Sequence, residues 1–219
     1  MSSSLWWELL TATWQTIYMV LISGLIAGII GIPLGFILFI TRKQQFLSMP
    51  VLHQSLGFLV NALRSIPFII LLIAIIPLTR LIVGTSIGTT AAIVPLALGA
   101  IPFIARIVEN AIAEIDSGLI EAAQAMGSTH LQIIRYVLWP ESLMSVISGF
   151  TVVLISLVGY SAMAGAIGGG GLGDFAIRYG YQQFDTTVMV ITVVVLVILV
   201  QCMQWLGNGI VKSISHKES

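Results

Sequence analysis

The sequence predicts an all-α integral membrane protein that crosses the bilayer five times within a single domain. Of its 219 residues, 58% are hydrophobic and only 8% are charged, whereas a water-soluble domain carries about 25% charged residues. Long charge-free stretches alternate with short polar links. Because lipid offers backbone groups no hydrogen-bonding partner, and these stretches lack the alternation of barrel strands, each stretch is expected to be a helix.

Five apolar segments are long enough to span, since about 20 residues at 1.5 Å each cover ~30 Å of hydrocarbon. The first lies in the interval without charge between Glu8 and Arg42, and the second is interrupted by Arg64. The predicted spans are 17–40, 56–76, 81–105, 143–167 and 186–210. They leave one long polar stretch, 107–141, and two shorter links.

Basic residues orient the chain. An odd number of spans places the termini on opposite sides, and only one orientation satisfies the positive-inside rule. With the N-terminus outside and the C-terminus cytoplasmic, seven cations lie on or near the inner side and two face out. The seven are Arg42, Lys43, Arg64, Arg106, Arg135, Lys212 and Lys217, and the two are Arg80 and Arg178. Residues 107–141 are therefore expected in the cytoplasm and the Gly-rich link 168–185 outside.

The predicted spans contain no residues that would couple transport to an ion gradient or to ATP. An ion-coupled transporter normally keeps an ionisable group in the bilayer, but all nine acids and all three histidines lie outside these spans. The ATP-binding pattern G-x-x-x-x-G-K-[ST] is absent, and the glycines of 168–173 are expected to form a turn or a close packing site. No catalytic set, metal-ligand spacing or basic block for nucleic acid stands out. We therefore expect a non-catalytic chain whose energy comes from another protein.

Arg64 is the one charge inside a predicted span. Its guanidinium can reach the inner interface or contact a neighbouring helix, which are structural roles. It can also belong to the solute path. A single cation is a poor ion-coupling device in either case.

The cytoplasmic stretch 116–127 predicts a short amphipathic helix. Asp116 or Ser117 can cap its start, and Gly127 can end it in the left-handed conformation. The apolar residues at helical spacing are Leu119, Ala123 and Met126. A helix without Lys or Arg on its polar face fits a groove on another protein better than the alternative, a layer of lipid headgroups.

A second short helix follows. Thr129 and Gln132 form a T-x-x-Q capping box, and Pro140 is expected to break the helix because the residue before a proline disfavours helical conformation. The cytoplasmic segment therefore predicts a helical hairpin that ends in a break.

The hairpin carries a recognisable signature. Glu121-Ala122-Ala123, Gly127, Val137 and Pro140 resemble the EAA motif of binding-protein-dependent ABC importer permeases, which reads E-A-A, three residues, G, nine residues, I, one residue, L-P. Val137 replaces the usual isoleucine and Trp139 the usual leucine, and both remain apolar. The segments 64–72, 77–88, 102–110 and 157–163 are similar to the permease subunits of bacterial methionine importers.

This resemblance implies a type I ABC importer permease fold and a homodimer in the bacterial inner membrane. Two cytoplasmic ABC ATPase subunits would bind ATP and Mg, and would dock at the coupling helix. An external substrate-binding lipoprotein would deliver D- or L-methionine. The ATPase-coupling positions are Glu121, Ala122, Ala123, Met126 and Gly127. Another small amino acid or zwitterion, an ion-coupled secondary transporter and a membrane scaffold are the alternatives.

Small residues with polar tips mark a candidate solute path in the fourth predicted span. They are Gly159, Tyr160, Ser161 and Met163. Such residues allow close helix crossing and some hydration, and a methionine is flexible enough to act as a plug. We expect this face to line a path at the dimer interface with Met163 near a gate. Ordinary helix packing is the alternative.

Overall fold

The computed structural model describes residues 3–43, 45 and 47–215, and all regular structure in them is helical. The elements are α1 (Ser3–Ile40), α2 (Pro50–Ser65), α3 (Phe68–Ala74), α4 (Ile76–Val83), α5 (Thr89–Ala113), α6 (Ser117–Ala125), α7 (His130–Ile133), the π-helical η1 (Ile134–Leu138), α8 (Trp139–Ala166), α9 (Gly171–Phe175), the π-helical η2 (Ala176–Tyr181) and α10 (Thr186–Ser215). Lys217, which enters the charge count, lies outside the described residues. The predicted all-α class is confirmed for the part that the structure describes.

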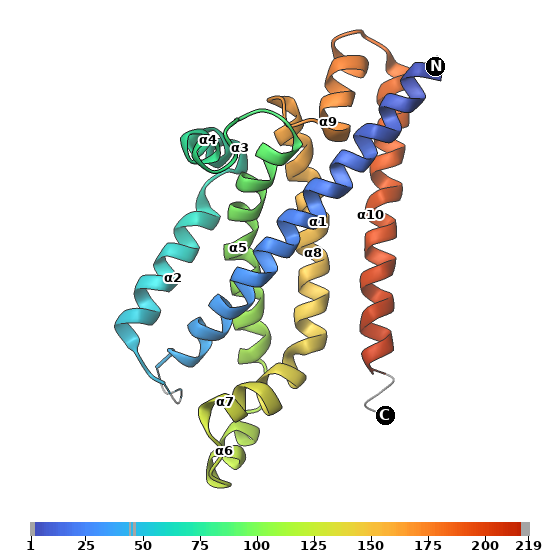
Figure 1. The fold of residues 1–219 in the computed structure, drawn as a ribbon. Helices are drawn as coiled ribbons and strands as arrows, with labels where there is room; N and C mark the ends of the chain where they lie inside the picture. The colour runs from blue at the N-terminus through green and yellow to red at the C-terminus, as the bar shows by residue number, and fades with distance from the viewer. Residues whose placement is uncertain (1–2, 44, 46, 216–219) are drawn as a thin grey trace.

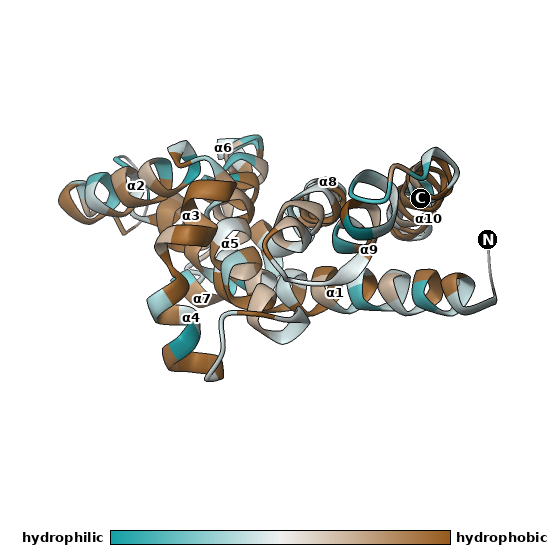
Figure 2. Ribbon diagram, turned by 90° about the horizontal axis from the view of Figure 1, so that it is seen from above, coloured by the Kyte–Doolittle hydropathy of each residue, from teal (hydrophilic) through white to brown (hydrophobic). Residues whose placement is uncertain are grey.

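Four helical stretches in the described residues are long and apolar enough to cross a membrane, and a fifth results if the bent pair α2–α3 is one span. Helix α1 crosses α5 and α8 obliquely, while α2 and α10 lie on opposite sides of them (Figure 1). Seen from above, α3 is strongly hydrophobic and hydrophilic residues form only scattered patches (Figure 2). This distribution suits a helix bundle whose outer surface faces lipid.

Glycines allow α1 to lie close to its neighbours. A Cβ atom at Gly31 would lie 2.9 Å from the Ile101 carbonyl oxygen, and one at Gly35 would lie 2.6 Å from that of Ala105. Gly24 and Gly28 meet side chains of α8 in the same way. Small residues at this spacing let helix backbones approach in lipid, where no hydrophobic effect drives association. They position α1 diagonally against α5 and α8.

Two helices begin at other residues than the predicted spans. Helix α1 begins at Ser3 and contains the whole predicted span 17–40. The helix expected over 81–105 begins at Thr89, since Gly84 and Gly88, with φ of 84° and 100°, separate it from α4. Left-handed glycines end helices because they have no Cβ to clash.

The second predicted span, 56–76, is not one helix. Helices α2 and α3 meet at an angle of 102°. Between them Ile66 is extended, with ψ of 124°, as the residue before a proline prefers. Pro67 then starts α3. The predicted span is therefore broken at Pro67.

The break expected at Pro140 does not occur. In a regular helix the proline ring collides with the carbonyl four residues earlier. Here η1, in which residues 134–138 are π-helical, widens the turn immediately before Pro140. Helix α7, η1 and α8 therefore form one continuous helical stretch, His130–Ala166.

The two ends of the bundle carry different elements (Figure 1). Helices α6 and α7 protrude at the end where α10 finishes. The start of α1, together with α3, α4 and α9, lies at the opposite end. The predicted cytoplasmic hairpin thus shares its end with the C-terminal end of α10, and the Gly-rich link shares the other end with the start of α1.

Candidate functional site

Helix α6 is terminated on both sides as predicted. Asp116 Oδ1 accepts a hydrogen bond from the Gly118 amide at 2.8 Å, which caps the first turn. Gly127 has a φ of 78°, and its amide donates to the Gln124 carbonyl at 2.9 Å. The Ser128 amide donates to the Ala123 carbonyl at 3.1 Å, which completes a Schellman motif. A Cβ atom at Gly127 would meet nothing within 4 Å, so backbone conformation rather than space demands glycine there.

The capping box that begins α7 is also confirmed. The Thr129 amide donates to Gln132 Oε1 at 2.7 Å, and the Gln132 amide donates to Thr129 Oγ1 at 3.4 Å. Two backbone donors that a helix start leaves unpaired are thereby satisfied. The turn between α6 and α7 is consequently defined from both sides.

The three apolar residues that the sequence analysis grouped on α6 do not share one face. Ala123 is buried, whereas Leu119 and Met126 are 46% and 79% exposed. Ile120, which the sequence analysis missed, packs inward with Ala123 in a cluster that includes Ile133 and Leu138. Its apolar side chain three residues before Ala123 is the signal that would have identified it. The inner face therefore anchors the hairpin to the bundle.

The outer face of α6 is exposed. Glu121, Ala122 and Met126 are exposed, as is Gly127. Four of the five predicted coupling positions thus share an accessible surface, and only Ala123 is turned away. The exposed Leu131 and Tyr136 extend apolar surface into α7 and η1.

The four path residues of α8 do not share one face. Gly159 and Met163 are exposed, while Ser161 is buried and its hydroxyl donates to the Val158 carbonyl at 2.7 Å. Tyr160 is half-buried and stacks on Phe68, with ring centroids 4.5 Å apart. Ser161 is therefore directed inward, away from the exposed Gly159 and Met163.

Gly159 and Met163 belong to an exposed stripe along α8. The other residues at the same helical spacing are Ser145, Ser148, Val152 and Ser156. The Ser156 hydroxyl donates to the Val152 carbonyl at 3.0 Å, so it is satisfied within its own helix. Because most side chains on this face of α8 are small and weakly polar, the face can be partly hydrated.

Arg64 lies deeper than the sequence suggested. Because α2 begins at Pro50, Arg64 is in its last turn, about 21 Å along the helix at 1.5 Å per residue. Arg64 therefore lies at the far end of α2 from the link between α1 and α2. Its guanidinium carbon lies 5.0 Å from the centroid of the Phe103 ring, halfway along α5. Contact with a neighbouring helix is the structural role that is observed.

The break between α2 and α3 opens a hollow of 230 Å³. It brings Arg64 together with Tyr160, two candidates that the sequence assigned to separate spans. The residues around it are Leu63, Arg64, Ser65, Ile66, Pro67, Phe68, Leu71, Gly99, Phe103 and Tyr160. The hollow is aromatic on several sides and carries one positive charge.

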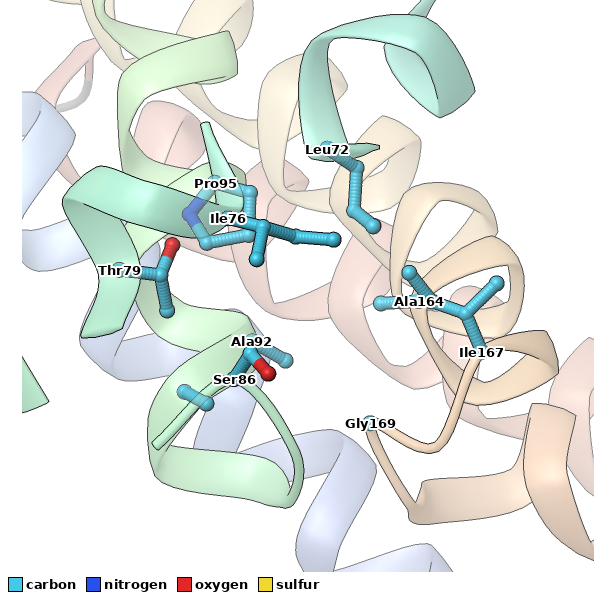
Figure 3. Close-up of a pocket in the computed structure, with 10 residues that line it drawn as sticks. Leu72, Ile76, Thr79, Ser86, Ala92, Pro95, Ala164, Ile167 and Gly169 are labelled. Carbon is cyan, nitrogen blue, oxygen red and sulfur yellow. The ribbon is translucent and has the colours of Figure 1, made fainter. Parts of the chain in front are cut away.

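A second hollow near α4 is too small for a solute. Its 20 Å³ accommodate about one water molecule. Figure 3 shows side chains of α3, α4, α5 and the end of α8 around it, among them Leu72, Thr79 and Ala164. The side chains around this hollow are therefore closely packed.

The Gly-rich link is packed rather than loose. The Gly171 amide donates to Gln15 Oε1 and the Leu172 amide to Thr16 Oγ1, both at 2.9 Å. The Gly88 amide donates to the Gly168 carbonyl at 2.9 Å. These bonds join the link to α1 and α5, so of the two expectations close packing is confirmed.

Glu109, which follows the predicted span 81–105, is a buried acid in α5. Helix α5 continues beyond that span to Ala113. Arg106 Nη1 lies 2.5 Å from Glu109 Oε2, and Arg106 Nη2 donates to the Gly57 carbonyl at 3.1 Å. The charge of Glu109 is thus neutralised by a structural pair that links α5 to α2.

Known proteins resemble this chain over nearly its whole length. Residues 31–216 match the family described as binding-protein-dependent transport system inner membrane component. A probable D-methionine transport system permease protein of Vibrio cholerae is 56% identical over 209 residues, which cover 95% of this chain and 93% of that protein. The D-methionine transport system permease protein of Escherichia coli is 53% identical over 165 residues, 75% of this chain and 76% of that protein.

A solved structure of the MetNI methionine ABC transporter in an inward-facing conformation contains a chain with the same fold. The TM-score is 0.96 at 51% identity, and the likeness covers 98% of this chain and 99% of that chain. Both relatives are named as transport permeases rather than enzymes. The chain therefore belongs to the family of binding-protein-dependent transport system inner membrane components, as a multi-pass membrane subunit.

Proposed function

We propose that this chain is the membrane-spanning permease subunit of an ATP-driven methionine importer, active as a homodimer with two separate ATPase subunits. The observation that carries the proposal is α6. Its ends are held by Asp116 and Gly127, its inner face is anchored, and its outer face presents Glu121, Ala122 and Met126. The names of the relatives and of the inward-facing transporter support the substrate and the assembly.

The proposal includes the side on which each element lies. We place the N-terminus outside and the C-terminus in the cytoplasm of a bacterium, with α2–α3 as one broken span among five. The position of α6 at the same end of the bundle as the end of α10 supports this orientation (Figure 1). Of the cations at helix ends, Arg42, Lys43 and Arg135 lie on the hairpin side by the order of the chain, as the positive-inside rule requires.

In this proposal the ATPases move α6, and α8 carries this motion to the solute path. ATP and Mg belong to the ATPase subunits in this proposal, and this chain holds no cofactor of its own. When the ATPases move the hairpin, the cluster of Ile120, Ala123 and Leu138 transmits the motion because packed cores resist deformation. The continuous stretch His130–Ala166 then carries it to Gly159 and Met163.

The solute path would run along the exposed stripe of α8, where two copies of the chain face each other. Gly159 and Met163 line it, with Met163 near the gate, and Tyr160 borders it from the side of the α2–α3 break. Ser161 has no part in it. An external binding lipoprotein delivers the solute, and lipid surrounds the dimer.

Reconstitution tests this function. Liposomes that contain the chain with its ATPase, supplied with ATP inside and binding protein outside, are expected to accumulate labelled methionine. Competition by D-methionine, L-methionine and other amino acids defines the stereochemistry and the solute class. Vesicles with the chain alone provide the control, and uphill uptake by them would overturn the proposal. Normal uptake of a different amino acid in place of methionine would revise the substrate only.

A further inference from the structure

The hollow at the α2–α3 break combines two electrostatic features. The first is the end of α2. The carbonyl of Leu63 would accept from residue 67 in a continuous helix, but residue 67 is a proline without an amide hydrogen. The 102° bend also turns the following amides away. The last carbonyls of α2 therefore carry the negative end of the helix dipole, and the residues to which they belong, 63–65, line the hollow.

The second feature is a cation without an anion. The two ion pairs among residues 3–43, 45 and 47–215 join Arg106 to Glu109 and Arg178 to Asp174. Neither involves Arg64. Its guanidinium lies over the Phe103 ring at 5.0 Å, and stacking on an aromatic face leaves the N–H edge of a guanidinium available. Such an edge matches the two oxygens of a carboxylate.

The remaining wall is aromatic. Phe68 and Tyr160 stack with their planes 9° apart, and Phe103 lies beside Arg64. Thioether sulfur makes favourable contacts with aromatic rings. The volume of 230 Å³ is below the range of about 300–1,000 Å³ for drug-sized ligands, so the hollow suits one small solute.

We propose that this hollow is a binding subsite for a zwitterionic amino acid inside the permease. Arg64 binds the carboxylate, the terminal carbonyls of α2 accept from the ammonium group, and Phe68, Phe103 and Tyr160 contact the side chain. Broken helices in membrane transporters bind solutes in the same physical way, through the exposed ends of their half-helices. The inference rests on the proposed function and adds a solute site to it.

Thiol protection tests the subsite without the binding protein. In the permease–ATPase complex with Cys202→Ser, Ser65→Cys places a thiol at the hollow and Ser55→Cys provides a control on the same helix. Millimolar methionine is expected to slow modification of Cys at 65 by a small thiol reagent at least fivefold. Methionine amide, which has no carboxylate, should not slow it, and neither compound should change the control. Equal protection by both compounds, or no protection, would overturn the proposal.

Variants of Arg64 supply the second test. Arg64→Met should remove the protection and reduce methionine uptake about tenfold, while Arg80→Gln, which removes a cation elsewhere, should leave both unchanged. Arg64→Lys should restore part of the uptake. If Arg64→Met does not assemble, Phe103→Leu replaces it, with the same loss of protection expected. Normal uptake by Arg64→Met would disprove the subsite alone, whereas absence of methionine uptake by the wild-type complex would disprove the proposed function.

Discussion

The ring of Tyr160 in α8 stacks on the ring of Phe68 in α3, with the centroids 4.5 Å apart and the planes 9° apart. This contact joins the helix that continues from the coupling hairpin to the helix that follows the α2–α3 break. The proposed path for work and the proposed solute site therefore meet at one pair of side chains.

Removal of the stack should affect stability and transport together. Tyr160→Leu is expected to cost about 1 kcal/mol, since aromatic pairs contribute 0.5–1.5 kcal/mol beyond area burial. A lower melting temperature of the purified complex and slower methionine uptake would measure it. Tyr160→Phe retains the ring and should melt as the wild type does. Equal melting temperatures for the Leu and Phe variants would show that the stack is not stabilising.

The role of Gly127 can be tested with substitutions that differ in how well they tolerate its positive φ rather than in size. Gly127→Val should uncouple ATP hydrolysis from uptake, because a β-branched residue at a φ of 78° is strained. Gly127→Asn should retain most of the coupling, since asparagine tolerates this conformation and no atom lies within 4 Å of the added Cβ. Both variants should insert in the membrane normally. Full transport by the Val variant would refute the role of the hairpin.

The two faces of α6 should respond differently to substitution. Met126→Asp places a charge on the exposed face and is expected to reduce co-purification of the ATPase at least tenfold, with the melting temperature of the isolated permease unchanged. Ala123→Leu overpacks the buried face and should lower that melting temperature, at a cost of about 1–3 kcal/mol. Undiminished ATPase binding by the Asp variant would place the docking surface elsewhere.

The ion pair of Arg106 and Glu109 within α5 should stabilise the protein, because it holds the guanidinium that donates to the Gly57 carbonyl of α2. Glu109→Gln removes one partner and leaves a partly buried guanidinium, which is expected to cost about 3 kcal/mol. Arg106→Met combined with Glu109→Gln should cost much less, because no charge is left unpaired. Thermal unfolding of the four members of this cycle measures the coupling. Additive effects of the two changes would mean that the pair contributes no interaction energy.

Sequence patterns predicted local features better than long-range ones. The caps of α6 and α7 were predictable because Asp116, Gly127 and the Thr129–Gln132 pair act on backbone groups within a few residues. The break at Pro67 was not, because prolines are tolerated in other spans, as Pro95 and Pro102 are in α5. Whether a proline bends a span depends on packing around it, which composition does not reveal.

The candidate site was predictable in part for the same reason. Helical spacing identified α6 as two-faced, but it could not tell which face meets the bundle, and so Ala123 was assigned outward and Ile120 was missed. Likewise the residues 159–163 were grouped by type, although one step along a helix rotates a side chain by about 100°. Ser161 therefore points away from Met163, and Arg64 meets Tyr160 only through the three-dimensional fold.

The π-helical turn before α8 has a geometric consequence. Five residues, 134–138, occupy a wider coil than an α-helix would give them. One surplus residue turns everything beyond it by about 100° around the helix axis. A single extra residue thus sets the direction in which Met163 points around the helix axis, relative to the exposed surface at Met126. Deletion of one residue from this π-helical turn would leave the helices on both sides folded, but their exposed faces would no longer point toward the same neighbours.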